Sequence, residues 1–190
     1  MNDVAVMLKD GRQGVVRPVR EADAAALAEL LIAVAAAGVG VVMLGDEMRR
    51  RRRDPMEGVS PYLHGGDNSG ARGCMLVAEV DGRIAGEGTI RRMSPSRLRH
   101  VAHIGLSVHP EFQGQGLGRA LMEGLMRWAR EVRDPEMPDI ARVDLAVFAD
   151  NVKARRLYES FGFEVEGVRR NFIRYEDGRE ADDLIMAVMI

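Results

Sequence analysis

The residues best suited to chemistry form a glycine-rich stretch past the middle of the chain, QGQGLG, from Gln113 to Gly118. The stretch follows the apolar strand pattern HVAHIGLSV and leads directly into the helical pattern LGRALMEGLMRWARE. Glycines at alternate positions leave the backbone uncovered, so its N–H groups can approach an anion, and the N-terminus of the following helix adds partial positive charge. The stretch therefore predicts a phosphate or pyrophosphate site that needs no lysine.

The spacing within this stretch argues against two common nucleotide sites. A P-loop needs a lysine and a Ser/Thr after its last glycine, and here Arg119 and Ala120 stand in those places. A dinucleotide fingerprint needs glycine or alanine where Arg119 stands, and it should follow the first strand of a βαβ unit. A tight turn without a ligand remains the alternative for this stretch taken alone.

A second candidate set lies on a short helix near the C-terminus. Asn151 is placed to open this helix, its apolar positions recur at helical spacing, and Gly162 can end it in a left-handed conformation. Tyr158 lies two turns after Asn151 on the same face, so both side chains can line one wall of a groove. The alternative is that Tyr158 is a core aromatic residue and Asn151 an N-cap.

The elements that must position these residues form a single mixed pattern. Strands are expected over VVRPV, CMLVAEV, RIAGEGTIRRM, HVAHIGLSV, RVDLAVF and two C-terminal segments. Residues 1–13, which include VAVML, could form an extra strand or a loose arm. Two further helices are expected, from Glu21 to about Ala37 and from Leu44 to Arg53. Because hairpins outnumber βαβ units, we predict an α/β fold of the α+β type. Its mixed, largely antiparallel, twisted sheet has six to seven strands, with about four helices on both faces.

Composition limits the class of protein. With 190 residues and 46% hydrophobic residues, the chain is long enough for one domain over residues 1–190, and its net charge of −2 gives no reason to expect nucleic acid. The single cysteine, Cys74, excludes an internal disulfide framework and favours a reducing, cytoplasmic location. Since it begins an apolar run, we interpret Cys74 as a buried strand residue rather than a nucleophile. No signal peptide, membrane span or metal-binding spacing is apparent.

The two candidate sets together resemble a known superfamily. VHPEFQGQGLGRALM, followed later by NVKARRLYESFGFEVEG, is similar to the GNAT superfamily of acyl-CoA-dependent N-acyltransferases, and the likeness extends over essentially the whole chain. It implies that acetyl-CoA is the acyl donor. Its pyrophosphate would bind at Gln113, Gly114, Gln115, Gly116, Leu117 and Gly118. Its pantetheine arm would lie along Leu106, Ser107 and Val108, where the sheet splays open. Asn151 matches the second signature, and Arg119 and Arg155 could reach phosphates or lie solvated on their helices.

The resemblance also implies a mechanism. An amine attacks the thioester directly, without a covalent enzyme intermediate, and the backbone N–H of Val108 or its neighbour stabilises the oxyanion. Tyr158 matches the family position for the acid that protonates the leaving thiolate, and a phenol (pKa about 10) is close enough to a thiol (about 8.5) for useful transfer. His103, where related sequences often carry Glu or Asp, and Glu87 are candidate bases, although each could be structural. Ser107 lacks the partners of a nucleophile.

The acceptor is less well defined. The C-terminal pattern resembles branches that acetylate amino acids and other small amines, so a small primary amine is the first hypothesis. Acetylation of a protein N-terminus or lysine and a non-catalytic acyl-CoA sensor are the alternatives, and a homodimer is possible. The run from Arg49 to Arg53 could recognise an acidic group or could be a solvated helix end.

Overall fold

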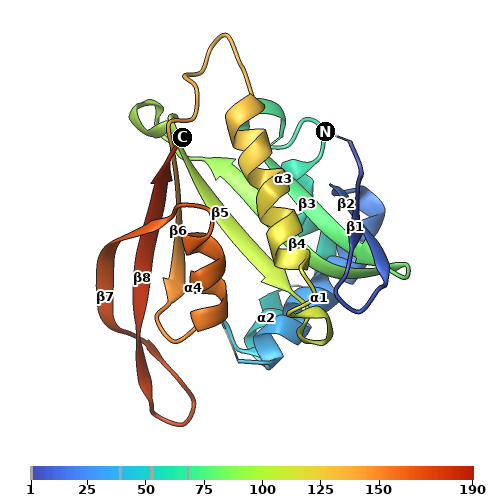
Figure 1. The fold of residues 1–190 in the computed structure, drawn as a ribbon, viewed down its shortest axis with the longest axis vertical. Helices are drawn as coiled ribbons and strands as arrows, with labels where there is room; N and C mark the ends of the chain where they lie inside the picture. Colours follow the sequence, from blue (N-terminus) through green and yellow to red (C-terminus); the bar gives the residue numbers. More distant parts are fainter. Residues whose placement is uncertain (1, 39, 52–53, 68) are drawn as a thin grey trace.

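The computed structural model describes residues 2–38, 40–51, 54–67 and 69–190, which form one mixed sheet with helices on both faces (Figure 1). The strands are β1 (Val4–Met7), β2 (Gln13–Pro18), β3 (Gly73–Val80), β4 (Arg83–Arg92), β5 (Val101–Val108), β6 (Arg142–Phe148), β7 (Glu164–Arg174) and β8 (Glu180–Met189). The helices are α1 (Ala24–Ala36), α2 (Gly45–Arg51), α3 (Leu117–Glu131) and α4 (Val152–Glu159). The strand order is β1-β2-β3-β4-β5-β6-β8-β7, and among these described strands only the β5–β6 pair is parallel.

The predicted fold class is confirmed, with one difference in the strand count. Among the described residues the sheet has eight strands rather than six to seven, because Val4–Met7 pairs with β2 instead of forming a loose arm. The predicted second helix is observed as far as Arg51; its last two residues, 52–53, lie outside the described part of the chain.

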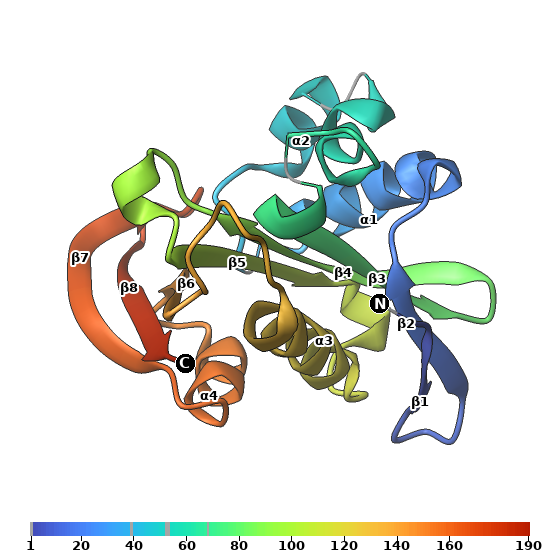
Figure 2. The ribbon, with the colours of Figure 1, turned by 90° about the horizontal axis from the view of Figure 1, so that it is seen from above.

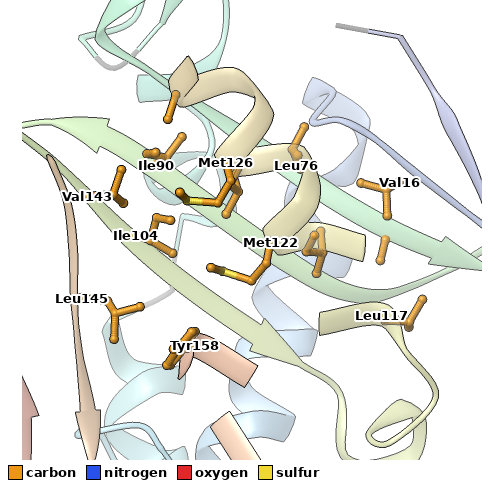
Figure 3. Close-up of a cluster of buried hydrophobic side chains, with 14 of the residues drawn as sticks. Val16, Leu76, Ile90, Ile104, Leu117, Met122, Met126, Val143, Leu145 and Tyr158 are labelled. Atoms are coloured by element: carbon orange, nitrogen blue, oxygen red, sulfur yellow. The ribbon is translucent and has the colours of Figure 1, made fainter. Parts of the chain in front are cut away.

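The helices cover the two faces of the sheet separately, with α1 and α2 on one face and α3 and α4 on the other (Figure 2). The larger hydrophobic core lies under α3, where Leu121, Met122 and Leu125 are fully buried at helical spacing against the strands (Figure 3). Gly124 allows this helix to approach the sheet, because a Cβ added there would lie 2.5 Å from Leu76 Cδ1. A smaller cluster, which includes Leu27, packs under α1.

The central strands β5 and β6 separate along their length, and this opening positions the site. Their parallel pairing is limited to the start of both strands, from Val101 opposite Arg142 to His103 opposite Asp144. After His103 the two strands diverge (Figure 1), whereas β5 stays paired with β4 as far as Val108. An unpaired strand edge presents N–H and C=O groups that are available for hydrogen bonding. Within the described residues, the second half of β5 is therefore a free edge inside the sheet.

Candidate functional site: an anion loop beside an open strand edge

The glycine stretch forms a loop whose backbone needs glycine. Gly114 and Gly116 have φ angles of +78° and +100°, which L side chains rarely adopt. A Cβ added at either position would meet nothing within 4 Å, so conformation rather than crowding requires glycine here. Gly118 differs, because its added Cβ would lie 3.3 Å from Leu157 Cδ2, where α3 packs against α4. The first two glycines shape the loop and the third allows close helix packing.

The N–H groups of this loop are available to bind an anion. Within the described part of the chain, no acceptor takes a hydrogen bond from the N–H groups of residues 114–119, and the first α3 bond runs from Ala120 N–H to the Gly116 carbonyl. The positive end of the α3 dipole lies at the same place. Gln113 ties the loop to the end of β5, since its side-chain amide donates to the Val108 carbonyl over 3.2 Å. The predicted anion site thus lies directly beside the free edge of β5.

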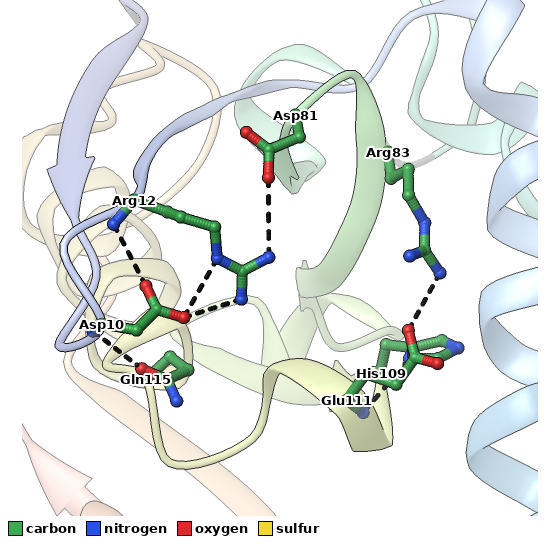
Figure 4. A network of polar contacts seen from close by, with 7 residues as sticks. All are labelled: Asp10, Arg12, Asp81, Arg83, His109, Glu111 and Gln115. Atoms are coloured by element: carbon green, nitrogen blue, oxygen red, sulfur yellow. Dashed lines mark hydrogen bonds and ion pairs between the residues drawn. The ribbon is translucent and has the colours of Figure 1, made fainter.

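The hairpin between β1 and β2 supports the loop from outside (Figure 4). Lys9 N–H donates to the Gln115 backbone carbonyl over 3.3 Å, and Asp10 N–H donates to the Gln115 side-chain oxygen over 3.2 Å. Asp10 in turn forms an ion pair with Arg12 at 2.7 Å. In a trans peptide the C=O and the following N–H point in opposite directions, so the Gly116 N–H is directed away from the hairpin. The N-terminal strand therefore fixes one anion-binding group of the loop.

Tyr158 lies in the core beside the opening between β5 and β6 (Figure 3). Its side chain is 6% exposed and its ring lies 6.1 Å from that of Phe163. Burial raises the pKa of Tyr158 to about 12, and the negative charge of Glu87 adds to the effect. Asn151 caps the same helix by accepting from Ala154 N–H over 3.3 Å.

The two predicted bases, Glu87 and His103, lie on the face of the sheet opposite to the one on which Tyr158 packs. Glu87 of β4 is directly opposite Ser107, and Arg91 is directly opposite His103. Residues directly opposite in an antiparallel pair point to the same face, and alternation along β5 puts His103 and Ser107 on one face. Glu87 also pairs with Val77, which packs in the cluster under α1, so this is the α1 face. Glu87 is 7% exposed and lies within electrostatic reach of Tyr158.

Asp144 contacts one of the candidate bases and was not identified from the sequence. Its Oδ1 lies 2.7 Å from His103 Nδ1, at the last paired position before β5 and β6 diverge. The available signal was the single acid in the strand RVDLAVF, two residues after Arg142, and local sequence does not show which strand lies beside it. The long-range pairing of the two strands creates this contact.

Comparison with known proteins identifies the family to which the chain belongs. The model of the Acetyltransferase (GNAT) family matches residues 43–163, which is more than half of the chain and includes both the anion loop and α4. The chain belongs to the GNAT family. The family resemblance inferred from the two motifs is therefore confirmed.

Two curated relatives of this GNAT chain differ in what they acetylate. The chain is 32% identical over 116 residues to the L-amino acid N-acetyltransferase AaaT of Escherichia coli K12, a match that covers 59% of this chain. It is 44% identical over 85 residues to the [ribosomal protein bS18]-alanine N-acetyltransferase of the same organism, which covers 45% of this chain. The matches span 65% and 53% of these relatives, less than two thirds of either.

Solved structures show the same GNAT fold over nearly the whole chain. A GNAT-family acetyltransferase from Streptococcus pneumoniae superposes with a TM-score of 0.75 at 24% identity and covers 93% of this chain and 99% of its own. The structure of yncA from Salmonella typhimurium, solved with its cofactor acetyl-CoA, gives 0.68 at 22% identity, with 92% of both chains covered. At these identities the likeness establishes the fold.

The predicted phosphate-binding arginines of this GNAT protein already have partners. Arg119 donates to Ser160 Oγ over 2.9 Å and its guanidinium lies 5.3 Å from the Phe161 ring centre, so it joins α3 to the end of α4. Arg155 Nε lies 3.2 Å from Glu159 Oε1 on the same helix, an ion pair without the geometry of a hydrogen bond. Binding of a phosphate by either side chain requires exchange of these contacts.

Three further observations concern the described part of this GNAT chain. No helix among the described residues is both long and apolar enough to cross a membrane. The same residues contain no group of three or more His, Cys, Asp or Glu side chains arranged to hold a metal ion. In the part of the arginine run that is described, Arg49 pairs with Asp46 at 2.9 Å on the exposed side of α2, while residues 52–53 lie outside the description.

Cys74 lies in β3, as expected, but is half-buried. Burial raises the pKa of its thiol to about 12. Because the thiolate is the reactive form, we expect alkylation by iodoacetamide at about pH 8 to be about a thousandfold slower in the native protein than in the same protein unfolded in urea. Equal rates in the two states, followed by mass spectrometry, would show that the thiol is not protected.

Proposed function

We propose that this GNAT protein transfers an acetyl group from acetyl-CoA to the α-amino group of an amino acid or of an N-terminal residue, by direct attack in a ternary complex. The observation that carries this proposal is the loop at residues 114–119, whose free N–H groups lie directly beside the unpaired edge of β5. The anion site matches the pyrophosphate of coenzyme A, and the adjacent open strand edge matches its pantetheine arm, which carries amides.

The residues present fit the donor. The loop N–H groups would hold the pyrophosphate, and the free edge at Leu106, Ser107 and Val108 would pair with the arm. When bound, acetyl-CoA supplies an activated acetyl thioester. A backbone N–H of the free edge of β5, on the side of His103, would face the negative charge that develops on the thioester oxygen. Asn151 holds the start of α4, which carries Tyr158, beside the opening.

Two side chains of opposite roles would complete the reaction. Tyr158 would donate its proton to the leaving thiolate. Its pKa of about 12 keeps the hydroxyl protonated at neutral pH but makes it a weaker acid than the ordinary phenol assumed from the sequence. His103 would take the proton of the attacking amine, directly or through water. Glu87 is the second candidate base; as a buried acid on the same face it would also attract the cationic form of the amine.

The choice of an α-amino group rests on what the two relatives share. One is named for L-amino acids and the other for an alanine of ribosomal protein bS18, and an α-amino group is common to both. A sensor without turnover is disfavoured, because this chain keeps Tyr158 in the position of the acid. Acetylation of a lysine side chain has no such support.

The donor half can be tested by titrating acetyl-CoA into variants of the loop. We expect Gly116→Val to weaken acetyl-CoA binding at least about tenfold, because a branched side chain disfavours the φ of +100° that directs the N–H groups. Isothermal titration calorimetry measures this change. Gly178→Val is the matched control, since Gly178 has a φ of +83° and equally open surroundings in the distant β7–β8 hairpin. Wild-type affinity in Gly116→Val would place the donor elsewhere.

A further inference from the structure

We propose that Asp144 is a positioning residue that orients His103 as the base of the transfer reaction. This inference rests on the proposed function and extends it by assigning a role to a carboxylate on β6. It stands on a short contact, on the place of that contact in the sheet, and on a second ion pair that holds the carboxylate.

The His103–Asp144 pair closes the opening between the two strands. The pair occupies the last parallel position of β5 and β6, and the free edge of β5 begins immediately after it. That edge runs from Ile104 to Val108, and Val108 is joined to the anion loop through Gln113. At about 3.3 Å per residue, His103 stands about 17 Å along the strand from Val108. A ligand that starts at the loop and follows the open edge is therefore directed toward this pair.

The contact defines the tautomer of His103. An ionised carboxylate can only accept a hydrogen bond, so Nδ1 must carry the proton that it donates to Asp144 over 2.7 Å. The neutral ring then has its lone pair on Nε2, which is the form a base requires. The His103 side chain is 37% exposed, so it remains accessible, whereas Asp144 is 22% exposed.

A second ion pair keeps Asp144 in place. Arg142 Nε lies 3.8 Å from Asp144 Oδ2, and the same guanidinium forms a two-pronged ion pair with Glu166 of β7. The chain of contacts thus runs from β5 through β6 to β7. Arg91 is the register partner of His103 on β4 and shares its face of the sheet.

The proton balance is complete without a further reactant. His103 Nε2 accepts a proton from the amine nitrogen as the N–C bond forms, and Asp144 stabilises the imidazolium while Nδ1 keeps its own proton. Tyr158 gives its proton to the sulfur as the C–S bond breaks. His103 then releases its proton to solvent, and Tyr158 regains one from solvent.

The test is Asp144→Asn, whose side-chain amide can donate to Nδ1 and so favours the wrong tautomer. We expect kcat to fall about a hundredfold with an unchanged KM for acetyl-CoA. A long-range ¹H–¹⁵N NMR spectrum of His103 is expected to show a proton on Nδ1 in the wild type and its loss from that nitrogen in the variant. Asp139→Asn, an exposed carboxylate on the preceding loop, is the control and should match the wild type in both measurements.

A double-mutant cycle separates a positioning role from a structural one. If Asp144 acts through His103, then adding Asp144→Asn to His103→Gln should cause no further loss of kcat. Wild-type kcat in Asp144→Asn, additive losses in the double variant, or a proton on Nε2 in the wild type would overturn the proposal. A wild-type protein that acetylates no amine would refute the proposed function instead, and the NMR spectrum would still decide whether Asp144 sets the tautomer.

Discussion

Tyr158→Phe is expected to lower kcat by about a hundredfold to a thousandfold and to leave the affinity for acetyl-CoA within about twofold. The substitution removes only the hydroxyl, and the remaining ring still fills its place in the core, where Tyr158 is 6% exposed. Initial rates of coenzyme A release and a calorimetric titration give the two quantities. Tyr175→Phe is the matched control, because it removes a tyrosine hydroxyl that donates to Asp150 away from the loop. Full activity in Tyr158→Phe would remove the tyrosine from the mechanism.

The pH dependence of this tyrosine has a defined sign. Its pKa in the folded protein is about 12, above the value of about 10 expected in the unfolded chain. The stabilisation from keeping the phenol neutral is therefore fully present below pH 10 and is lost as the pH rises toward 12. We expect no alkaline loss of activity from Tyr158 below about pH 11. An alkaline limb below that value that disappeared in Tyr158→Phe would contradict this expectation.

Asp23→Ala is expected to have the largest effect on stability, lowering the free energy of unfolding by about 3 kcal/mol. Arg17 of β2 makes two 2.8 Å hydrogen bonds to Asp23, and the two side chains are 5% and 9% exposed. Asp23 also accepts from Arg20 N–H over 2.7 Å, just before α1. Removing the carboxylate leaves a buried guanidinium with Glu79 as its remaining acidic partner. The pair thus joins the first helix to the sheet.

Urea denaturation measures this effect, and an exposed ion pair supplies the control. Asp46→Ala breaks a contact of similar length to Arg49, but both side chains are mostly exposed, so its midpoint should match that of the wild type. Burial raises the pKa of Asp23, and hydrogen bonds from Arg17 and Arg20 together lower it by more, so the net pKa lies below the usual 3.8. The stabilisation is therefore present above about pH 4 and is lost at lower pH. Equal stability of Asp23→Ala and Asp46→Ala would contradict the account.

Local patterns were sufficient to predict the elements and the loop. Alternating apolar residues indicated the strands. The left-handed conformations of Gly114 and Gly116 could be expected, because glycine adopts them more readily than any other residue. The contacts that complete the site depend on the path of the whole chain. Asp144 meets His103 only because β6 adds beside β5 in parallel, after α3 has crossed the sheet. Lys9 reaches Gln115 only because the first segment forms a strand, a choice that four apolar residues could not decide.

The measurement that tests the central claim most directly is acetyl transfer from acetyl-CoA to a panel of amines. The panel includes the L-amino acids, a peptide that begins with alanine and the same peptide with a blocked N-terminus. It also includes a lysine whose α-amine is blocked and whose side-chain amine is free. Release of coenzyme A and mass spectrometry of the products report the reaction together. We expect the amount of coenzyme A released to equal the amount of acetylated α-amine formed, with no release from the acceptors whose α-amine is blocked. Tight acetyl-CoA binding without an acetylated product from any α-amine would contradict it.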